Sequence, residues 1–273
     1  MQSSRGDVTR TELTRFPADS SVTAATIIDR NFTGPLSESV ESYPDGLIIV
    51  LDKPLHWTSA DAVRKIKFTL QKHFHQKKIK VGHAGTLDPL ATGLLIICVG
   101  KATKISEQLQ SHTKEYVATI EFGATTPSYD LEKEIDMTYP FGHITKESLE
   151  DALKGFIGEQ EQIPPIFSAK MVNGVRAYEF ARAGEPVEVK PATITIERAE
   201  LLGFGTAPSG RPQACIRLRC SKGTYIRSFA RDLGVAVGSG AHLTALRRTL
   251  SGDFEINNAI SLEYFLSSHT FAV

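Results

Sequence analysis

The sequence has few of the residues that mark secreted, membrane-spanning or zinc-binding proteins. Its 273 residues include only three cysteines, Cys98, Cys215 and Cys220, and their spacing does not match a zinc site. All three lie in apolar, strand-like runs, which is typical of buried, reduced thiols. No apolar run approaches the ~20 residues that span a bilayer, and the N-terminus has no apolar signal core. These absences favour a cytoplasmic protein with no membrane span.

The chain also has no excess of charge. Lys and Arg number 31, as do Asp and Glu, so the formal net charge is zero and composition alone indicates no partner. Charge is unevenly distributed, however, because residues 64–80 ("RKIKFTLQKHFHQKKIK") include seven basic residues and no acid. This basic segment is either a solvated helix face or a surface that contacts nucleic-acid phosphates. The charge pattern alone does not separate the two.

The pattern of apolar residues indicates the fold class. Residues 1–45 are polar and weakly periodic, so we expect an N-terminal extension that is partly disordered, followed by one catalytic domain over 46–273. Thr58 or Ser59 is expected to cap a helix, and Thr224 a second helix that Gly238 ends. Strands and helices alternate without a regular βαβ rhythm, and several strand neighbours resemble hairpins. The sequence therefore predicts an α+β fold with a mixed, largely antiparallel sheet flanked by helices and loops.

A single carboxylate, Asp88, stands in the nearly uncharged stretch "VGHAGTLDPLATGLL" (81–95). An Asp before a proline often does no more than close a turn. Here it lies between two apolar strand-like runs, and the end of a strand is where functional groups gather. Hydrolysis of a glycosidic bond uses a pair of acids, so a solitary carboxylate fits a nucleophile better. His83 and Asp88 as metal ligands are a weaker interpretation, since no third ligand has suitable spacing.

Aromatic and basic residues elsewhere have two interpretations each. In "CSKGTYIRSFARDLG" (220–234), Arg227 near a helix start either faces solvent or pairs with a distant carboxylate and keeps it ionised. Tyr225 and Tyr116 either pack in the core or stack on a bound base. No phosphate-binding loop ending in GK[ST] is present, so nucleotide hydrolysis loses support.

Six segments together resemble the TruB-type tRNA pseudouridine synthases in order and approximate spacing, and they extend from about Gly46 to Glu255. They are "LDKPLHWTSADAV", "VGHAGTLDPLATGLLIICVGKATK", "KEYVATIEFGATT", "QIPPIFSAKMVNGVRAYEFARAGE", "CSKGTYIRSFARDLG" and "GAHLTALRRTLSG". The resemblance implies the pseudouridine-synthase fold and isomerisation of the T-loop uridine at tRNA position 55. It further implies that the reaction needs no cofactor and no metal. The partner would be the T-arm stem-loop, and the protein would act as a monomer.

The resemblance also implies roles for individual residues. Asp88 matches the catalytic aspartate, which attacks either uracil C6 or ribose C1′, and Arg227 matches the arginine that pairs with it. Tyr116 matches the tyrosine that stacks on the target base and takes part in removing the C5 proton. The other matches are Tyr225 and Leu246, which line the uracil pocket, and His83, which fills the space left by the flipped nucleotide.

Other positions of the resemblance predict RNA contacts or depart from the family. Lys222, Arg247 and Arg248 are expected to contact phosphates along with the basic segment. Pro127 stands where the family commonly has an Asp, and Asp130 is an uncertain substitute for it. Leu55-His56 replaces the more usual small residues in the first segment. The chain ends soon after the last motif, so we expect no C-terminal RNA-binding domain.

Two other functions remain open at this stage. The chain could be an RNA-binding or RNA-folding protein in which catalysis is secondary or lost, but its intact Asp88, Tyr116 and Arg227 favour an enzyme. It could also be a metal-dependent hydrolase that uses His83 and Asp88. Activity that persists in the presence of a chelator would dispose of the hydrolase.

Overall fold

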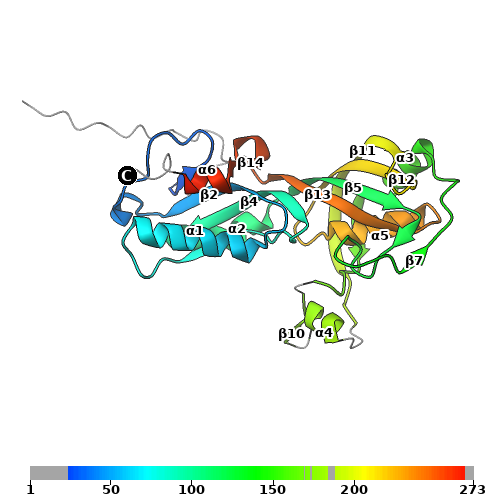
Figure 1. Cartoon of the computed structure of the whole chain (residues 1–273), viewed down its shortest axis with the longest axis horizontal. Helices are drawn as coiled ribbons and strands as arrows, with labels where there is room; N and C mark the ends of the chain where they lie inside the picture. Colours follow the sequence, from blue (N-terminus) through cyan, green and yellow to red (C-terminus); the bar gives the residue numbers. More distant parts are fainter. Residues whose placement is uncertain (1–23, 169, 173, 184–187, 268–273) are drawn as a thin grey trace, which may run out of the picture.

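One mixed sheet contains most of the strands and runs along the length of the molecule (Figure 1). The computed structural model describes residues 24–168, 170–172, 174–183 and 188–267. In chain order the described elements are β1 (Thr26–Ile28), η1 (Val40–Ser42), β2 (Leu47–Lys53), α1 (Ser59–His73), β3 (Val81–His83), β4 (Ala91–Val99), η2 (Gly100–Ile105), α2 (Ser106–Ser111), β5 (Lys114–Phe122), β6 (Ala124–Thr125), β7 (Met137–Thr138), α3 (Lys146–Lys154), β8 (Gly158–Gln162), β9 (Met171–Val172), β10 (Val175–Arg176), α4 (Ala177–Ala183), β11 (Ala192–Thr206), β12 (Pro212–Cys220), α5 (Ile226–Ala236), β13 (Ala241–Ser251), β14 (Phe254–Glu255), η3 (Ile256–Asn258), β15 (Ile260–Ser261) and α6 (Leu262–Leu266).

The sheet follows the order β1-β2-β4-β13-β5-β12-β11-β8, with β3, β14 and β15 paired beside this path. Among the described residues, seven of its ten strand pairings are antiparallel. The predicted mixed, largely antiparallel α+β sheet is therefore confirmed. No described helix is long and apolar enough to cross a membrane.

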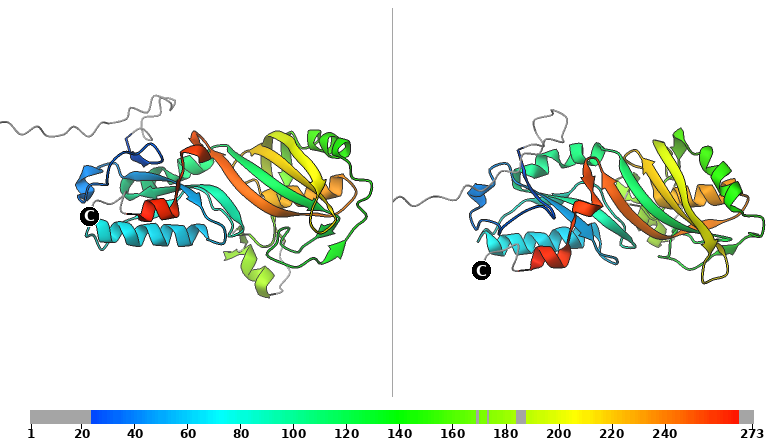
Figure 2. Two further views of the ribbon diagram at one scale, coloured as in Figure 1. Left: turned by 45° about the horizontal axis from the view of Figure 1, so that its top comes forward. Right: turned by 90° about the horizontal axis from the view of Figure 1, so that it is seen from above.

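Strand β13 connects two parts of the molecule (Figures 1 and 2). One part holds β2 and β4 with α1 and α2, and the other holds β5, β11 and β12 with α3 and α5. β13 runs antiparallel to β5 over most of its length and parallel to β4 over residues 246–248. The residues in the middle of β13 therefore lie where the two parts meet.

The two parts bury their strands differently. In β2, Ile49 and Leu51 pack in one apolar cluster while Ile48 and Val50 pack in another on the opposite face. A strand that is covered on both faces needs a continuous apolar run, which is what residues 47–51 provide. In β5 the residues alternate, and Tyr116 and Ile120 lie on the buried face as the period of two predicts.

The two predicted helix caps have different outcomes. Thr58 caps α1 in a capping box, because its side chain accepts from the N–H of Asp61 while the Asp61 carboxylate accepts from the N–H of Thr58. Thr224 does not cap α5, so this prediction is wrong. The N-cap is Tyr225, and the Thr224 hydroxyl instead donates to the carbonyl of Ser221 in the preceding turn. Gly238, at φ +67°, follows α5 as expected.

Packed structure begins earlier than the sequence pattern predicts. β1 pairs in parallel with β2, and Ile28 and Leu36 are buried against the sheet. A three-residue strand is too short to give a recognisable periodicity, so the pattern did not reveal it. Residues 1–23 of the expected extension lie outside the described residues.

Candidate active site

Asp88 lies in the loop between β3 and β4, and neighbouring segments hold the backbone of this loop. The Ser59 hydroxyl, at the start of α1, donates to the Leu87 carbonyl (3.1 Å) and accepts from the Leu87 N–H (2.8 Å). On the other side of Asp88, the N–H of His56 donates to the Pro89 carbonyl (2.8 Å). The carboxylate thus stands on a fixed backbone although its side chain is 41% exposed.

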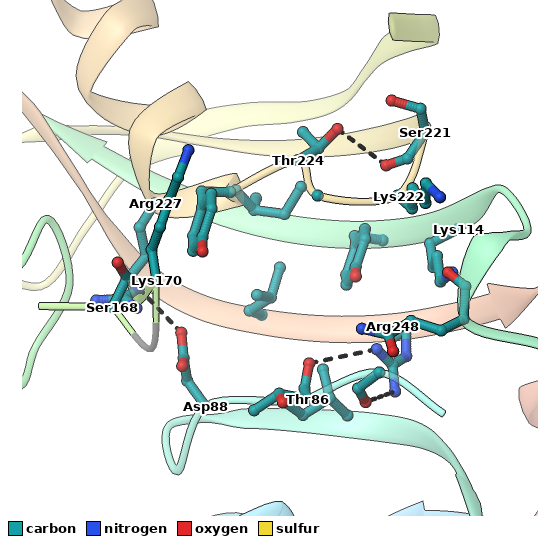
Figure 3. Close-up of a pocket in the computed structure, with 18 residues that line it drawn as sticks. Thr86, Asp88, Lys114, Ser168, Lys170, Ser221, Lys222, Thr224, Arg227 and Arg248 are labelled. Carbon is teal, nitrogen blue, oxygen red and sulfur yellow. Dashed lines mark hydrogen bonds and ion pairs between the residues drawn. The ribbon is translucent and has the colours of Figure 1, made fainter. Parts of the chain in front are cut away.

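Arg227, in the first turn of α5, pairs with this carboxylate as the sequence predicts. Its Nε lies 2.9 Å from Oδ2 of Asp88 (Figure 3), and its side chain is only 6% exposed. The guanidinium also donates to the carbonyls of Ser128 (3.3 Å) and Phe167 (3.0 Å). These bonds fix the plane of the guanidinium, so it can hold the carboxylate in one orientation.

A second carboxylate lies near the same guanidinium. Oδ2 of the buried Asp130 is 3.7 Å from Nε of Arg227, and its Oδ1 accepts from the N–H of Glu132 (3.0 Å). Pro127, three residues earlier, does not provide an acid at all. Arg227 Nε therefore has two carboxylates near it, the exposed Asp88 at 2.9 Å and the buried Asp130 at 3.7 Å.

Asp88 and Arg227 line one pocket with a volume of about 340 Å³. Five of the six predicted site residues are brought together in its wall, namely Asp88, Tyr116, Tyr225, Arg227 and Leu246. Figure 3 shows Asp88 and Arg227 on one side of the pocket, with Lys114, Lys222 and Arg248 on the other. A volume of this size accommodates a small ligand such as one nucleoside.

The two tyrosines of the pocket, Tyr116 and Tyr225, have protonated, uncharged hydroxyl groups. Burial raises the pKa of Tyr116, while the positive charge of the neighbouring Arg248 guanidinium acts in the opposite direction. Burial also raises the pKa of Tyr225. Both rings are therefore uncharged near pH 7 and offer flat faces together with hydroxyl groups that can donate or accept.

His83 is the one predicted site residue that does not line this pocket. It ends β3, is half-buried, and its pKa is lowered by burial and then by the charge of Arg248. Its buried Nδ1 has no hydrogen-bond partner within the described part of the chain. A neutral imidazole with an unsatisfied nitrogen stands in the segment that leads to Asp88.

Two lysines with lowered pKa values were not identified from the sequence. Burial lowers the pKa of Lys53 to about 8, against the opposing charge of Asp88, and lowers the pKa of Lys114, in the pocket wall, to about 8. Lys53 is fully buried and donates to the carbonyls of Pro54 (2.9 Å) and Trp57 (2.6 Å). The sequence feature that could have indicated Lys53 is its position at the end of the buried apolar run "LIIVLDK".

The predicted phosphate contact of Arg248 is wrong. Arg248 is 1% exposed, and its guanidinium donates to backbone carbonyls beneath the pocket. Arg247, on the other face of β13, makes two bonds to Asp52 (2.7 and 3.1 Å), so its guanidinium is engaged as well. Lys222 does lie in the pocket wall. Successive residues of a strand point to opposite faces, which is why the two arginines have different surroundings.

Across the described ranges, no group of three or more His, Cys, Asp or Glu side chains is arranged to hold a metal ion. The structure does not place His83 beside Asp88 in the pocket wall. The geometry around Asp88 is that of a carboxylate paired with a guanidinium next to an aromatic and aliphatic surface.

The fold and this pocket define an RNA-modifying isomerase of the pseudouridine synthase class. The model of the TruB family pseudouridylate synthase N-terminal domain matches residues 71–226, and that of the tRNA pseudouridylate synthase B C-terminal domain matches residues 227–272. The chain therefore belongs to the TruB family. The second match begins with α5 and includes β13, so in this chain it covers part of the central sheet.

Curated relatives and solved structures agree with this membership. A tRNA pseudouridine synthase B from Phocaeicola vulgatus is 56% identical over 82% of this chain and 93% of its own length. The enzyme of that name from Flavobacterium johnsoniae is 51% identical over 84% and 98%. A solved Cbf5-Nop10-Gar1 complex matches with a TM-score of 0.62 and 29% identity, over 86% of this chain and 58% of the matched chain. The predicted pseudouridine-synthase fold is confirmed.

Proposed function

We propose that this protein isomerises the T-loop uridine at position 55 of tRNA to pseudouridine, with Asp88 as the nucleophile. The observation that carries the proposal is the 2.9 Å pair of Asp88 and Arg227 in a pocket that also contains Tyr116 and Leu246. An exposed carboxylate that a buried guanidinium holds in one orientation is suited to attack an electrophilic carbon. The names of the relatives, tRNA pseudouridine synthase B, support tRNA as the substrate.

The target nucleotide has to leave the T loop before it can react. The C5 and C1′ atoms of a stacked uridine are shielded, so extrusion into a pocket is required at a cost of a few kcal/mol. The pocket of about 340 Å³ provides the space, and the flat ring of Tyr116 replaces part of the lost stacking. Leu246 supplies an apolar wall, which helps to keep water from the reacting carbon.

Two routes are open to the carboxylate, and both balance without a cofactor. In one, Asp88 attacks ribose C1′, the C1′–N1 bond breaks, and the uracil leaves as an anion that turns to present C5. In the other, Asp88 adds to uracil C6 before the base is detached. In both, a C1′–C5 bond forms, the bond to the carboxylate breaks, the C5 proton is lost and N1 gains a proton. Arg227 stabilises the carboxylate at the beginning and end of either route.

Tyr116 has two roles in this scheme. Its ring stacks on the base, and its hydroxyl takes part in transfer of the C5 proton. Because burial raises the pKa of Tyr116, the hydroxyl is protonated and can accept the C5 proton only as it passes its own proton on. Tyr225 lies on the same pocket wall and lines the space for uracil.

The basic segment (residues 64–80) is the surface that we assign to the T-arm backbone. Its seven lysines and arginines are all exposed. At its start, Trp57, Arg64, Lys65 and Phe68 line a shallow groove, and Phe68 is 56% exposed. Cationic and aromatic side chains together suit contact with RNA phosphates and bases. Since one chain supplies all of the pocket residues, we propose a monomer that acts on cytoplasmic tRNA.

The experiment is to map pseudouridine in tRNA transcripts treated with the purified protein or with Asp88→Asn. The wild-type protein is expected to convert the T-loop uridine. Asp88→Asn is expected to form no pseudouridine while its tRNA affinity stays within roughly tenfold, because an amide cannot attack and be released as a carboxylate can.

Asp151→Asn on α3 is the matched control. This acid is 75% exposed and pairs with Lys154 at the surface, so the variant is expected to convert tRNA like the wild type. Wild-type protein that binds tRNA without converting it would contradict the proposed reaction. An active Asp88→Asn variant would contradict the role assigned to Asp88.

A further inference from the structure

Arg248 is a nearly fully buried arginine in the wall of the pocket. It is 1% exposed, and it is the largest of the fully buried side chains. Burial of a cation is unfavourable unless the surrounding groups satisfy its charge and its donors. Within the described residues no carboxylate lies within 4 Å of its guanidinium.

The guanidinium of Arg248 is bound by backbone carbonyls. Its Nε donates to Leu94 (2.6 Å) in β4, its Nη2 to Gly85 (3.1 Å) and its Nη1 to Thr86 (3.5 Å). Gly85 and Thr86 belong to the loop that carries Asp88. Figure 3 shows the bonds from Arg248 to this loop. Arg248, itself on β13, therefore links this strand by hydrogen bonds to β4 and to the segment just before Asp88.

The same side chain reaches Tyr116. Arg248 lies directly opposite Tyr116 in the register of β13 and β5, so both side chains emerge on the same face of the sheet. The register of these two strands shifts between Arg248 and Leu250, which marks an irregularity of the kind that redirects side chains. One guanidinium therefore bonds the loop that carries Asp88 and lies on the same face as Tyr116, where its positive charge acts to lower the pKa of the Tyr116 hydroxyl.

Gly93 makes this position of Arg248 possible. It faces Arg248 in the parallel register of β4 and β13. A Cβ at Gly93 would lie 2.3 Å from the Arg248 carbonyl oxygen and 2.8 Å from its backbone nitrogen, and the φ of Gly93 is +99°. Only a glycine lets the two backbones approach so closely, and that approach brings the Arg248 Nε to the Leu94 carbonyl.

We propose that Arg248 is a positioning residue of the isomerase, which holds the loop that carries Asp88 and the hydroxyl of Tyr116 in a fixed relation. The inference rests on the proposed function, because it assigns Arg248 to the reaction that Asp88 and Tyr116 are proposed to perform. The nucleophile and the proton carrier come from a loop and a strand. Arg248 bonds the backbone of that loop and lies opposite Tyr116 in the strand register.

The test compares Arg248→Lys with Arg219→Lys on β12, an arginine that is 46% exposed and pairs with Glu197 away from the pocket wall. For each full-length variant, the single-turnover rate of pseudouridine formation, the tRNA affinity and the melting temperature are measured. Lysine keeps the charge but cannot bond three separated acceptors in one plane. We expect Arg248→Lys to lower the rate by about 100-fold through misplacement of the reacting groups. Affinity should change little, and Arg219→Lys should behave like the wild type.

Arg248→Ala provides the second measurement. Guanidinium at low millimolar concentration can enter the vacated site, so we expect it to restore part of the lost rate of this variant and not to affect Asp88→Asn. Restoration supports the proposal, because a general loss of stability would not respond to the ion. A near-wild-type rate for Arg248→Lys, a rate that falls only as the folded fraction falls, or no restoration by guanidinium would each overturn it. A wild-type protein without activity would instead refute the proposed function.

Discussion

Arg227 is the side chain that contacts both the exposed acid of the pocket, Asp88, and the buried acid Asp130. Its guanidinium contacts Asp88, Asp130 and the carbonyls of Ser128 and Phe167. A lysine ammonium cannot reach four acceptors in this planar arrangement. We expect Arg227→Lys to lower the single-turnover rate of pseudouridine formation by about 100-fold or more, because the carboxylate loses its orientation.

The control for this variant is Arg219→Lys. Arg219 lies on β12, is 46% exposed and pairs with Glu197 at the surface. The Arg219→Lys variant is expected to keep the wild-type rate, since exposed ion pairs contribute little to stability. Turnover of Arg227→Lys close to that of the wild type would show that the pair with Asp88 is not needed for the reaction.

Lys53 gives a prediction for the pH dependence of stability. Burial lowers its pKa from 10.5 to about 8 in the folded protein. Between these two values the unfolded chain binds more protons at this residue than the folded chain. The contribution of Lys53 to the free energy of unfolding therefore increases as the pH rises from about 8 to 10.5, by at most about 1.4 kcal/mol per pH unit.

The measurement is urea unfolding of the wild type and of Lys53→Gln at several pH values. The difference in free energy of unfolding, wild type minus variant, should be constant from pH 6 to about 7 and should then increase toward pH 10. Glutamine retains a donor for one of the two carbonyls that Lys53 binds. A difference that is constant over the whole range would mean that the ammonium is not held at a lowered pKa.

At the scale of the element, α5 reaches its position because Gly234 lets it lie against β13. A Cβ at Gly234 would be 2.5 Å from the backbone nitrogen and 2.8 Å from the Cβ of Ala241. We expect Gly234→Ala to push the helix away from the strand and to lower the free energy of unfolding by about 1–3 kcal/mol. Because Arg227 is on the same helix, the rate should fall as well.

Gly205→Ala in β11 is the control, since a Cβ there meets no atom within 4 Å. It should leave stability equal or slightly raised, because Ala is less costly than Gly in a strand. Both variants are compared by chemical unfolding and by single-turnover assays. Equal stabilities would show that the close approach of α5 and β13 can be relaxed without cost.

Helices and their caps could be predicted where the residues that form them lie close together in the sequence. The cap of α1 was predicted at Thr58 or Ser59, and Thr58 fills that role by bonding Asp61 three residues later. Thr224 offered the same local signal and failed, because its hydroxyl bonds to the turn after β12 and Tyr225 is the N-cap instead. The Asp88–Arg227 pair was suggested by the resemblance, but its 2.9 Å geometry depends on how a loop and a helix meet.

At the scale of the whole molecule, the basic segment and the pocket belong to one proposed RNA surface. Lys77 and Lys78 are exposed at the end of this segment. We expect the double variant Lys77→Glu, Lys78→Glu to weaken tRNA binding and to flatten its salt dependence, since each lost phosphate contact removes about 0.9 from the slope of log K against log salt.

Binding is measured at several salt concentrations beside a charge-matched control on α3. Lys146 and Lys154 are 60% and 76% exposed and lie in the other part of the molecule (Figure 1). The control variant Lys146→Glu, Lys154→Glu should retain the wild-type slope. If the slope of log K against log salt is unchanged in the Lys77 and Lys78 variant, the basic segment is a solvated surface that does not contact tRNA.

The sequence by itself determined the order of the motifs and the class of fold, because these depend on local patterns, and its resemblance to a known family indicated the residues that carry the proposed chemistry. The tertiary structure alone decided which side chains meet. It buried Arg248 in the pocket wall while Arg247 pairs with Asp52, kept His83 out of that wall and placed Asp130 3.7 Å from Arg227. Such contacts join residues far apart in the chain, and strand register and close backbone approach fix them.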